Sequence, residues 1–239
     1  MIPTLSTFPA LAAFVLVLAA AWGLDVVALD GGTTSLPWLI REQGLYLSGL
    51  LAIGLMSLAM VLATRPTVLE RPLGGMDRIF RLHKWAGILA AMFATLHWLI
   101  EMSDDIIKSL YGKSGRPEHD DFGGLYEILR DAGEELGEFA IYLVLAMVVL
   151  SLWKRFPYKF WRHLHRAMPL LYLLLAFHAA VLAPPDYWTQ PVGVLLALLL
   201  AAGTVASLIA LTGRIGHDRK VRGVGTAVSS PTPDLTEIV

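Results

Sequence analysis

Four of the seven histidines lie in or beside apolar stretches and form two pairs with nearly equal spacing. His83 and His97 are fourteen residues apart, and His165 and His178 are thirteen residues apart. At about 1.5 Å per residue, these separations correspond to roughly 21 and 20 Å along a helix. Because an ionisable side chain inside a membrane is costly and usually functional, the two pairs are the first candidates for chemistry.

Two parallel helices with histidines at two matched depths could hold two planar macrocycles, each iron bound by one imidazole from each helix. The chain has no cysteine, which excludes iron–sulfur clusters, thiolate nucleophiles and covalently attached c-type heme. We therefore predict two b-type hemes. The alternatives are a zinc or copper site, which needs three or four ligands at one level, and histidines that only hydrogen-bond between helices.

Helical phase fits the first pair of histidines better than the second. At about 100° per residue, the directions of His83 and His97 around the helix axis differ by roughly 40°, whereas those of His165 and His178 differ by roughly 140°. His163 would match His178 better, at roughly 60°. Pro169 removes a backbone hydrogen bond and bends the intervening helix. Spacing alone therefore leaves His163 open as an alternative to His165.

The elements that carry these histidines are predicted to be membrane spans. The chain has 239 residues, of which 56% are hydrophobic and 16% charged, against about 25% charged in soluble proteins. A span needs roughly 17 to 25 apolar residues. Six runs qualify, near residues 8–29, 44–63, 82–100, 137–153, 165–183 and 191–212. No Lys or Arg precedes the first run, so we expect an uncleaved helix rather than a signal peptide.

Positive charge is concentrated in alternate loops, which would lie on the same side of the membrane. Segments 65–84, 154–166 and 214–222 contain 14 of the 19 Lys and Arg residues, whereas loop 101–138 contains 11 acids and four bases. The positive-inside rule then places both termini in the cytoplasm and the acidic loop outside. We predict an all-α, six-transmembrane-helix bundle, a multi-pass protein of the bacterial inner membrane. The net charge of −1 gives no reason to expect a nucleic-acid partner.

The acidic loop contains two further patterns. Apolar residues between Leu125 and Leu136 recur at three- and four-residue steps, which predicts a short amphipathic helix on the outer membrane surface. Glu118, His119 and Asp120, followed by Asp121, form a dense acidic run. Such a run could concentrate ferric ions, since hard oxygen ligands suit a hard cation; a solvated acidic loop is the alternative.

The residues around the histidines resemble the ferric reductase and NADPH oxidase transmembrane domain family. D-R-I-F-R-L precedes His83, and F-W-R-H-L precedes His165. The family has an Asp-Arg pair before its first ligand, Phe-Trp before its third, and the same two spacings between ligands. The resemblance extends over roughly residues 44–212 and favours His165 over His163 as the ligand.

This resemblance implies electron transfer across the membrane. NAD(P)H would reduce a cytosolic FAD, and electrons would pass to an inner heme held by His83 and His165. An outer heme held by His97 and His178 would follow, and then an external acceptor, ferric iron or dioxygen. The protein's share is to fix geometry and burial.

Other side chains could serve the same path. Four arginines cluster at the inner level and could pair the heme propionates, although topology and anionic-lipid contact also explain basic residues there. They are Arg78, Arg81, Arg162 and Arg166. Phe93 or Tyr172 could lie between the hemes, although aromatic residues at helical spacing more often pack in a core.

The chain is predicted to have two parts. Residues 1–212 form the heme domain, and residues 213–239 form a cytosolic tail. Residues 221–228 and 235–239 favour strands and flank the turn sequence S-S-P-T-P-D, which predicts a hairpin. In the family that the chain resembles, a flavin-binding β-barrel begins here, so the chain would stop at its first strands. No G-x-G-x-x-G motif is present, so FAD and NAD(P)H would need a separate cytosolic domain or electron-donor protein.

Three other hypotheses remain open at this point. The heme-binding membrane subunit of a periplasmic methionine sulfoxide reductase system also resembles this core and draws its electrons from elsewhere. A proton-coupled transporter would use intramembrane histidines as relays and would need further acids inside the spans, but Asp25 is the only acid in the interior of a predicted run, and it lies near the outer end. In a purely structural membrane subunit, the matched pairs would be a coincidence.

Overall fold

The computed structural model describes residues 7–28, 34–116, 123–153, 155–213, 215, 228–232 and 235–238. The long helices in this part of the chain are α1 (Thr7–Ala28), α2 (Leu36–Ala63), α4 (Met76–Glu101), α6 (Gly124–Leu152), α8 (Met168–Leu182) and α9 (Pro191–Leu211). The shorter elements are α3 (Thr67–Leu73), α5 (Asp104–Tyr111), α7 (Tyr158–His165), the 3₁₀ helix η1 (Pro185–Thr189), β1 (Val228–Thr232) and β2 (Leu235–Ile238).

Four membrane spans are supported by helix length and composition. They are Thr7–Val27, Leu36–Ala63, Tyr158–Leu182 and Pro191–Leu211, and the bent pair α4 and α5 gives a fifth if it is counted as one span. The apolar part of α6 runs only from Gly137 to Leu152 because acidic residues occupy its first half. The described residues thus form an integral membrane protein with four or five candidate spans, and the count of six stays a prediction.

Two helices differ from the sequence prediction in ways that affect the site. The expected surface helix near Leu125–Leu136 is not separate, because α6 continues without a break into the apolar segment. The helix expected to bend at Pro169 is instead interrupted just before this residue. Helix α7 ends at His165, and α8 starts at Met168 with Pro169 in its first turn. Proline is favoured in a first turn because its missing N–H has no intrahelical partner there.

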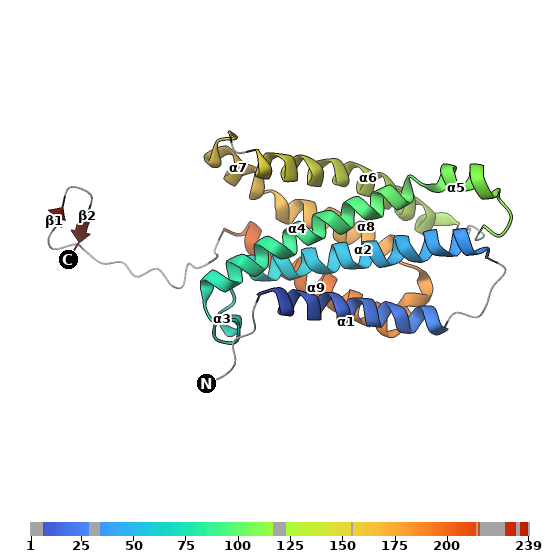
Figure 1. Ribbon diagram of the computed structural model, residues 1–239, viewed down its shortest axis with the longest axis horizontal. Coiled ribbons are helices and arrows are strands. Elements are labelled where there is room, and N and C mark those ends of the chain that lie inside the picture. Colours follow the sequence, from blue (N-terminus) through green and yellow to red (C-terminus); the bar gives the residue numbers. More distant parts are fainter. Residues whose placement is uncertain are drawn as a thin grey trace.

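The helices form two layers with α2 near the middle of the bundle. Helix α2 packs along α4 and α9, α1 covers the α2 and α9 side, and α6 packs on α8 (Figure 1). One buried cluster joins α1, α2, α8 and α9, and a second joins α1, α2 and α4. A smaller cluster around Ala140, Val144 and Leu171 joins α6 to α8. The layer of α6 and α8 therefore faces the layer of α2 and α4.

The two ends of the bundle carry opposite charge. Helices α3 and α7 and the end of α9 lie at the left end in Figure 1, and α5 and the start of α6 lie at the right end. Basic residues are concentrated at the first end and acidic residues at the second. Helix α1 starts at the same end at which α9 finishes. The assignment of the basic end to the cytoplasm rests on the positive-inside rule and stays a prediction.

The tail contains a two-stranded antiparallel pair. Strand β1 pairs with β2, with Val228 opposite Ile238 and Ser229 opposite Glu237. The first strand begins at Val228 and includes the S-S-P-T segment that the sequence assigns to the turn. Residues 216–227, which contain most of the expected first strand, lie outside the described residues.

Candidate metal centre

A long cavity lies between the layer of α2 and α4 and the layer of α6 and α8. Its volume is about 2220 Å³, and α7 and the ends of α9 also contribute to its walls. Sites for single drug-sized ligands usually measure about 300 to 1,000 Å³. All four predicted ligands line the cavity, namely His83, His97, His165 and His178. The cavity is therefore large enough for more than one ordinary ligand.

The four histidines face each other in the predicted pairs. The ring centroids of His83 and His165 are 6.1 Å apart, and those of His97 and His178 are 6.2 Å apart. In both pairs the ring planes are at 90°. A metal held linearly between two imidazole nitrogens, at about 2.0 to 2.1 Å from each, requires centroids roughly 6.3 to 6.5 Å apart. Each pair is thus spaced to bind one metal ion between its rings.

Three of these rings are anchored by a backbone carbonyl. His83 Nδ1 lies 2.9 Å from Ala59 O, His97 Nδ1 lies 3.0 Å from Leu45 O, and His178 Nδ1 lies 2.8 Å from Gly133 O. A carbonyl oxygen can only accept, so Nδ1 carries the proton and Nε2 keeps its lone pair. This is the tautomer that metal-binding histidines use, with the second nitrogen fixing the ring orientation.

His165 is held differently from the other three. Its ring stacks on Trp161 with centroids 4.7 Å apart and planes 15° apart. His163 is exposed, does not line the cavity, and donates its Nδ1 proton to Lys159 O within the same helix. The structure therefore brings His165, not His163, opposite His83. Spacing alone leaves His163 open, because helical phase applies only to a continuous helix, and α7 ends at His165 before α8 begins at Met168.

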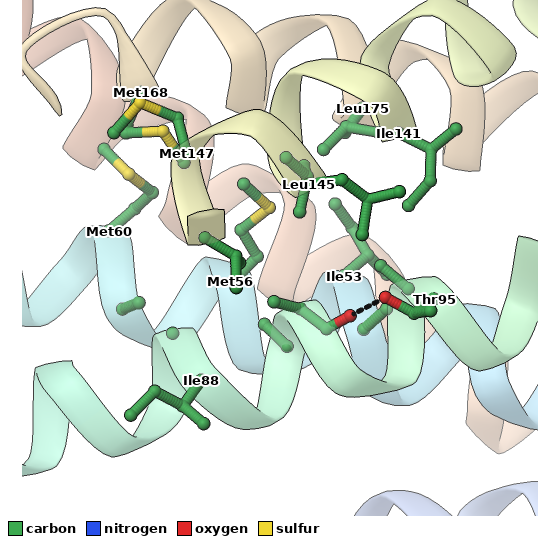
Figure 2. Close-up of a pocket in the computed structure, with 18 of the residues that line it drawn as sticks. Ile53, Met56, Met60, Ile88, Thr95, Ile141, Leu145, Met147, Met168 and Leu175 are labelled. Atoms are coloured by element: carbon green, nitrogen blue, oxygen red, sulfur yellow. Dashed lines mark hydrogen bonds between the residues drawn. The ribbon is translucent and has the colours of Figure 1, made fainter. Parts of the chain in front are cut away.

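The wall between the two histidine levels is apolar and rich in methionine. Met56 and Met60 come from α2, Met147 from α6 and Met168 from α8 (Figure 2). On α2 these two methionines lie close in sequence to the inner anchor Ala59 and at least eleven residues from the outer anchor Leu45. The remaining wall is mostly aliphatic. Thioethers are flexible and polarisable, so they can pack against an irregular partner.

Phe93 and Tyr172 do not line this wall, which corrects the suggestion that either lies between the hemes. Tyr172 is completely buried and turns towards α9. Its hydroxyl lies 2.8 Å from Ser57 Oγ and donates to Leu200 O at 3.4 Å. Phe93 packs in the clusters of α1 and α2. Both aromatic residues belong to the core, which was the alternative interpretation.

The inner end of the cavity is basic, but its residues differ partly from those predicted. Arg162 and Arg166 line it, as do Arg65 and Lys84. Arg78 and Arg81 do not line it. Sequence reasoning missed Arg65, whose φ of 55 is the one positive value at a non-glycine position within the described ranges. Its guanidinium lies over the Phe80 ring, 5.1 Å from the centroid.

The outer end of the cavity is acidic. Glu101, Glu134, Glu135 and Glu138 line it. Tyr187 also lies at this end, with its ring 5.8 Å from that of Tyr46. Burial raises the pKa of the Tyr187 hydroxyl, and nearby Tyr46, Asp25 and Glu42 raise it further. The acidic run at residues 118–121 lies outside the described residues.

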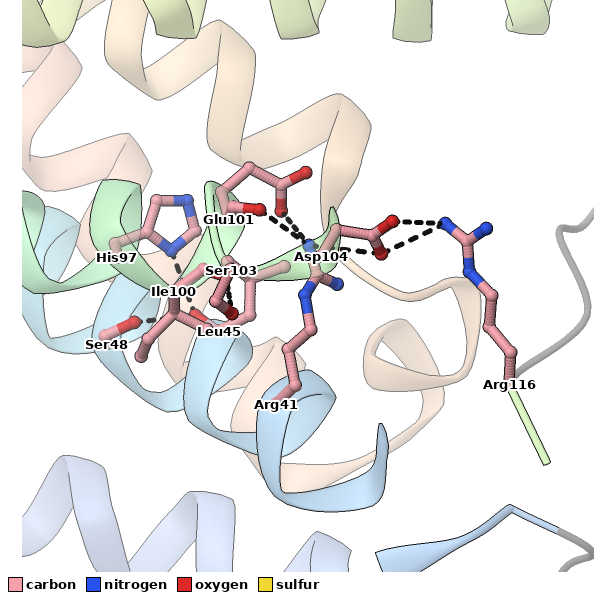
Figure 3. Close-up of polar contacts among 9 residues, drawn as sticks. All are labelled: Arg41, Leu45, Ser48, His97, Ile100, Glu101, Ser103, Asp104 and Arg116. Carbon is pink, nitrogen blue, oxygen red and sulfur yellow. Dashed lines mark hydrogen bonds and ion pairs between the residues drawn. The ribbon is translucent and has the colours of Figure 1, made fainter. Parts of the chain in front are cut away.

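A network of ion pairs lies beside His97 at the outer end (Figure 3). Arg41 Nη2 donates to Glu101 O at 2.9 Å and to Glu101 Oε2 at 3.1 Å, and it lies 3.7 Å from Asp104 Oδ1. Arg116 contacts both oxygens of Asp104 at 3.0 and 3.2 Å. The side chain of Arg41 is only 13% exposed. The network therefore ties the start of α2 to the end of α4 and to α5.

Zinc or copper sites normally need three or four ligands at one level. Among the residues that the structure describes, no group of three or more His, Cys, Asp or Glu side chains could hold a metal ion. Two histidines per level suit a metal whose other ligands come from a planar macrocycle, as in heme. The donor set thus fits the predicted cofactor better than a bare ion.

Comparison with protein families gives a match. Residues 48–176, more than half of the chain, match the family model described as "Ferric reductase like transmembrane component". The matched range contains three of the four cavity histidines. The fourth, His178, lies two residues after the end of the range. No curated protein matches the chain.

Proposed function

Because the chain belongs to the family of ferric reductase-like transmembrane components, we propose that it carries electrons across the membrane through two b-type hemes. His83 and His165 would hold the inner heme, and His97 and His178 the outer heme. The observation that carries this proposal is the pair of facing imidazoles at each of two levels, with centroids 6.1 and 6.2 Å apart.

The hemes, when bound, accept and release single electrons, and the chain supplies their surroundings. Carbonyls fix the rings of His83, His97 and His178, so that each Nε2 points at the metal position. The methionine and aliphatic wall would keep the surroundings of bound hemes apolar between the two levels. A low-polarity wall also limits the rearrangement that accompanies a change of charge.

The charges at the two ends support a direction in which electrons would enter at the basic end and leave at the acidic end. Arg162 and Arg166, joined by Arg65 and Lys84, would hold the propionates of the inner heme, since guanidinium groups suit carboxylates. Arg78 and Arg81 do not line the cavity. Their positive charge is better explained by membrane topology or by contact with anionic lipids.

The donor would be a cytosolic flavin and NAD(P)H domain, or an electron-donor protein, that meets the basic end. FAD and NAD(P)H would belong to that partner, and the tail at residues 213–239 would lie on the same side of the membrane. The acceptor would be ferric iron or dioxygen at the acidic end. We place the protein in the bacterial inner membrane as six spans with both termini in the cytoplasm.

A visible spectrum of the purified protein tests the proposal. We expect a sharp b-type α band after dithionite reduction, with two hemes per chain. His97→Leu should lose the outer heme, whereas His163→Leu is a matched control that should keep both because His163 is exposed and outside the cavity. Absence of the α band from the unmodified protein would refute electron transfer by this route.

A further inference from the structure

Each histidine of the outer pair bonds to a helix carbonyl that is followed by a glycine four residues later. His97 bonds to Leu45 O on α2, and Gly49 follows. His178 bonds to Gly133 O on α6, and Gly137 follows. The same arrangement therefore occurs on two different helices, one on each side of the cavity.

The physical link between carbonyl and glycine lies in helix geometry. The carbonyl of residue i already accepts the N–H of residue i+4. The Cα–Cβ bond of a helical residue tilts towards the N-terminus, so the side chain at i+4 covers the turn that presents this carbonyl. Glycine at i+4 leaves the oxygen accessible to a second donor from outside the helix.

Both glycines lie directly against the imidazole that uses the opened carbonyl. A Cβ added at Gly49 would lie 3.1 Å from both Cε1 and Nδ1 of His97, closer than ordinary van der Waals contact. A Cβ added at Gly137 would overlap Cε1 and Nδ1 of His178. The ring of each outer ligand thus occupies the space that a side chain would fill.

The inner pair lacks this arrangement. His83 bonds to Ala59 O, and the residue four positions later is Ala63. His165 has no hydrogen bond in the part of the chain that the structure describes, and Trp161 fixes its ring by stacking. The glycines are therefore a feature of the outer level only.

We propose that Gly49 and Gly137 are positioning residues that seat the two ligands of the outer heme, which rests on the proposed function. Each glycine leaves the space in which one imidazole lies against the helix while its Nδ1–H bonds to the carbonyl, and so fixes the depth and plane of that imidazole. The hydrogen bond also raises the basicity of Nε2. A more basic ligand favours the oxidised metal, so the two glycines hold the outer midpoint potential down.

The experiment compares alanine variants of the full chain in detergent by heme content, electron paramagnetic resonance and redox titration. Gly137→Ala should reduce heme from two per chain to one, with loss of the outer signal only. Gly49→Ala imposes a milder contact and should keep two hemes. Its outer low-spin signal should shift, because that signal depends on the angle between the imidazole planes, and its outer potential should rise.

Two matched controls separate ligand seating from helix packing. Gly54→Ala lies on α2 like Gly49, but its Cβ would meet Leu18 Cδ1 at 2.7 Å rather than a histidine ring. Gly44→Ala lies on α2 and would make only an ordinary contact of 3.5 Å with Ile100. Both controls should keep two hemes with unchanged spectra.

The outcomes decide the inference. Equal heme loss in Gly54→Ala and Gly137→Ala would overturn it, because disturbed helix packing would then explain both. Two hemes with unchanged spectra and potentials in Gly137→Ala and Gly49→Ala would also overturn it. If Gly137→Ala does not fold, the inference is tested by comparing the outer low-spin signal and potential of Gly49→Ala with those of Gly44→Ala. If the unmodified protein binds no heme, the proposed function itself fails, and this result is distinct from all the others.

Discussion

The indole of Trp161 stacks on the imidazole of His165, with ring centroids 4.7 Å apart and planes 15° apart. The two residues are one helical turn apart on α7, so a short helix carries both the ligand and the group that fixes its plane. Trp161 is itself held, because its Nε1 donates to Ser151 Oγ at 2.8 Å. A contact between side chains thus takes the place of the carbonyl anchor found at the other three histidines.

Replacing Trp161 should therefore affect the inner heme alone. Trp161→Leu removes the flat surface against His165, so we expect a weakened or lost inner heme and an unchanged outer signal. Trp161→Phe keeps a ring and should retain both hemes, since aromatic stacking contributes about 0.5 to 1.5 kcal/mol beyond area burial. Heme content and paramagnetic resonance spectra would measure this. An equal change at both hemes in Trp161→Leu would contradict the assignment.

The basic inner end should tune the inner heme potential. Arg166 lines the cavity on the turn next to His165, and Arg81 is exposed outside it. Removing a positive charge disfavours the reduced, more negative state. Arg166→Gln should therefore lower the inner midpoint potential, whereas Arg81→Gln should leave it unchanged. Redox titration followed at the α band provides the measurement, and equal shifts in the two variants would show that the effect is only that of the general surface charge.

Much of the site could be predicted because it depends on spacing along helices. The pairing of His83 with His165, and of His97 with His178, follows from matched depths on parallel helices, and the geometry agrees with it. The position of His165 opposite His83 could not be derived from phase, since the helix is interrupted between His165 and Met168.

Features that depend on contacts between distant segments could not be predicted. The choice of Arg65 over Arg78 at the cavity depends on the turn after α2, where Arg65 adopts a positive φ. The carbonyl anchors at Leu45 and Gly133 join helices 52 and 45 residues away in sequence. Nothing in the local pattern of an apolar segment identifies which carbonyl a histidine from another helix will reach.

The outer ion-pair network should contribute to stability. Arg41→Ala removes a largely buried guanidinium from Glu101 and Asp104, and we expect a loss of about 1 to 3 kcal/mol in the free energy of unfolding. Lys108→Ala is the matched control, because Lys108 and Asp105 form an exposed pair at 3.7 Å. Such pairs contribute about 0 to 1 kcal/mol. Thermal unfolding in detergent at low and high salt would measure both, and an equal effect of the two variants would contradict the prediction.

Tyr172 should stabilise the fold without taking part in electron transfer. Its hydroxyl bonds to Ser57 and to Leu200 O, and a Cβ at Gly203 would overlap it, so the phenol fills a fitted site between α2 and α9. Tyr172→Phe should reduce the free energy of unfolding by about 1 to 2 kcal/mol, since buried Ser57 loses one partner but keeps its bond to Ile53 O. Heme content and the rate of heme oxidation by an external acceptor should stay unchanged. A slower rate in Tyr172→Phe at normal heme content would place the phenol on the electron path after all, despite its position outside the cavity wall.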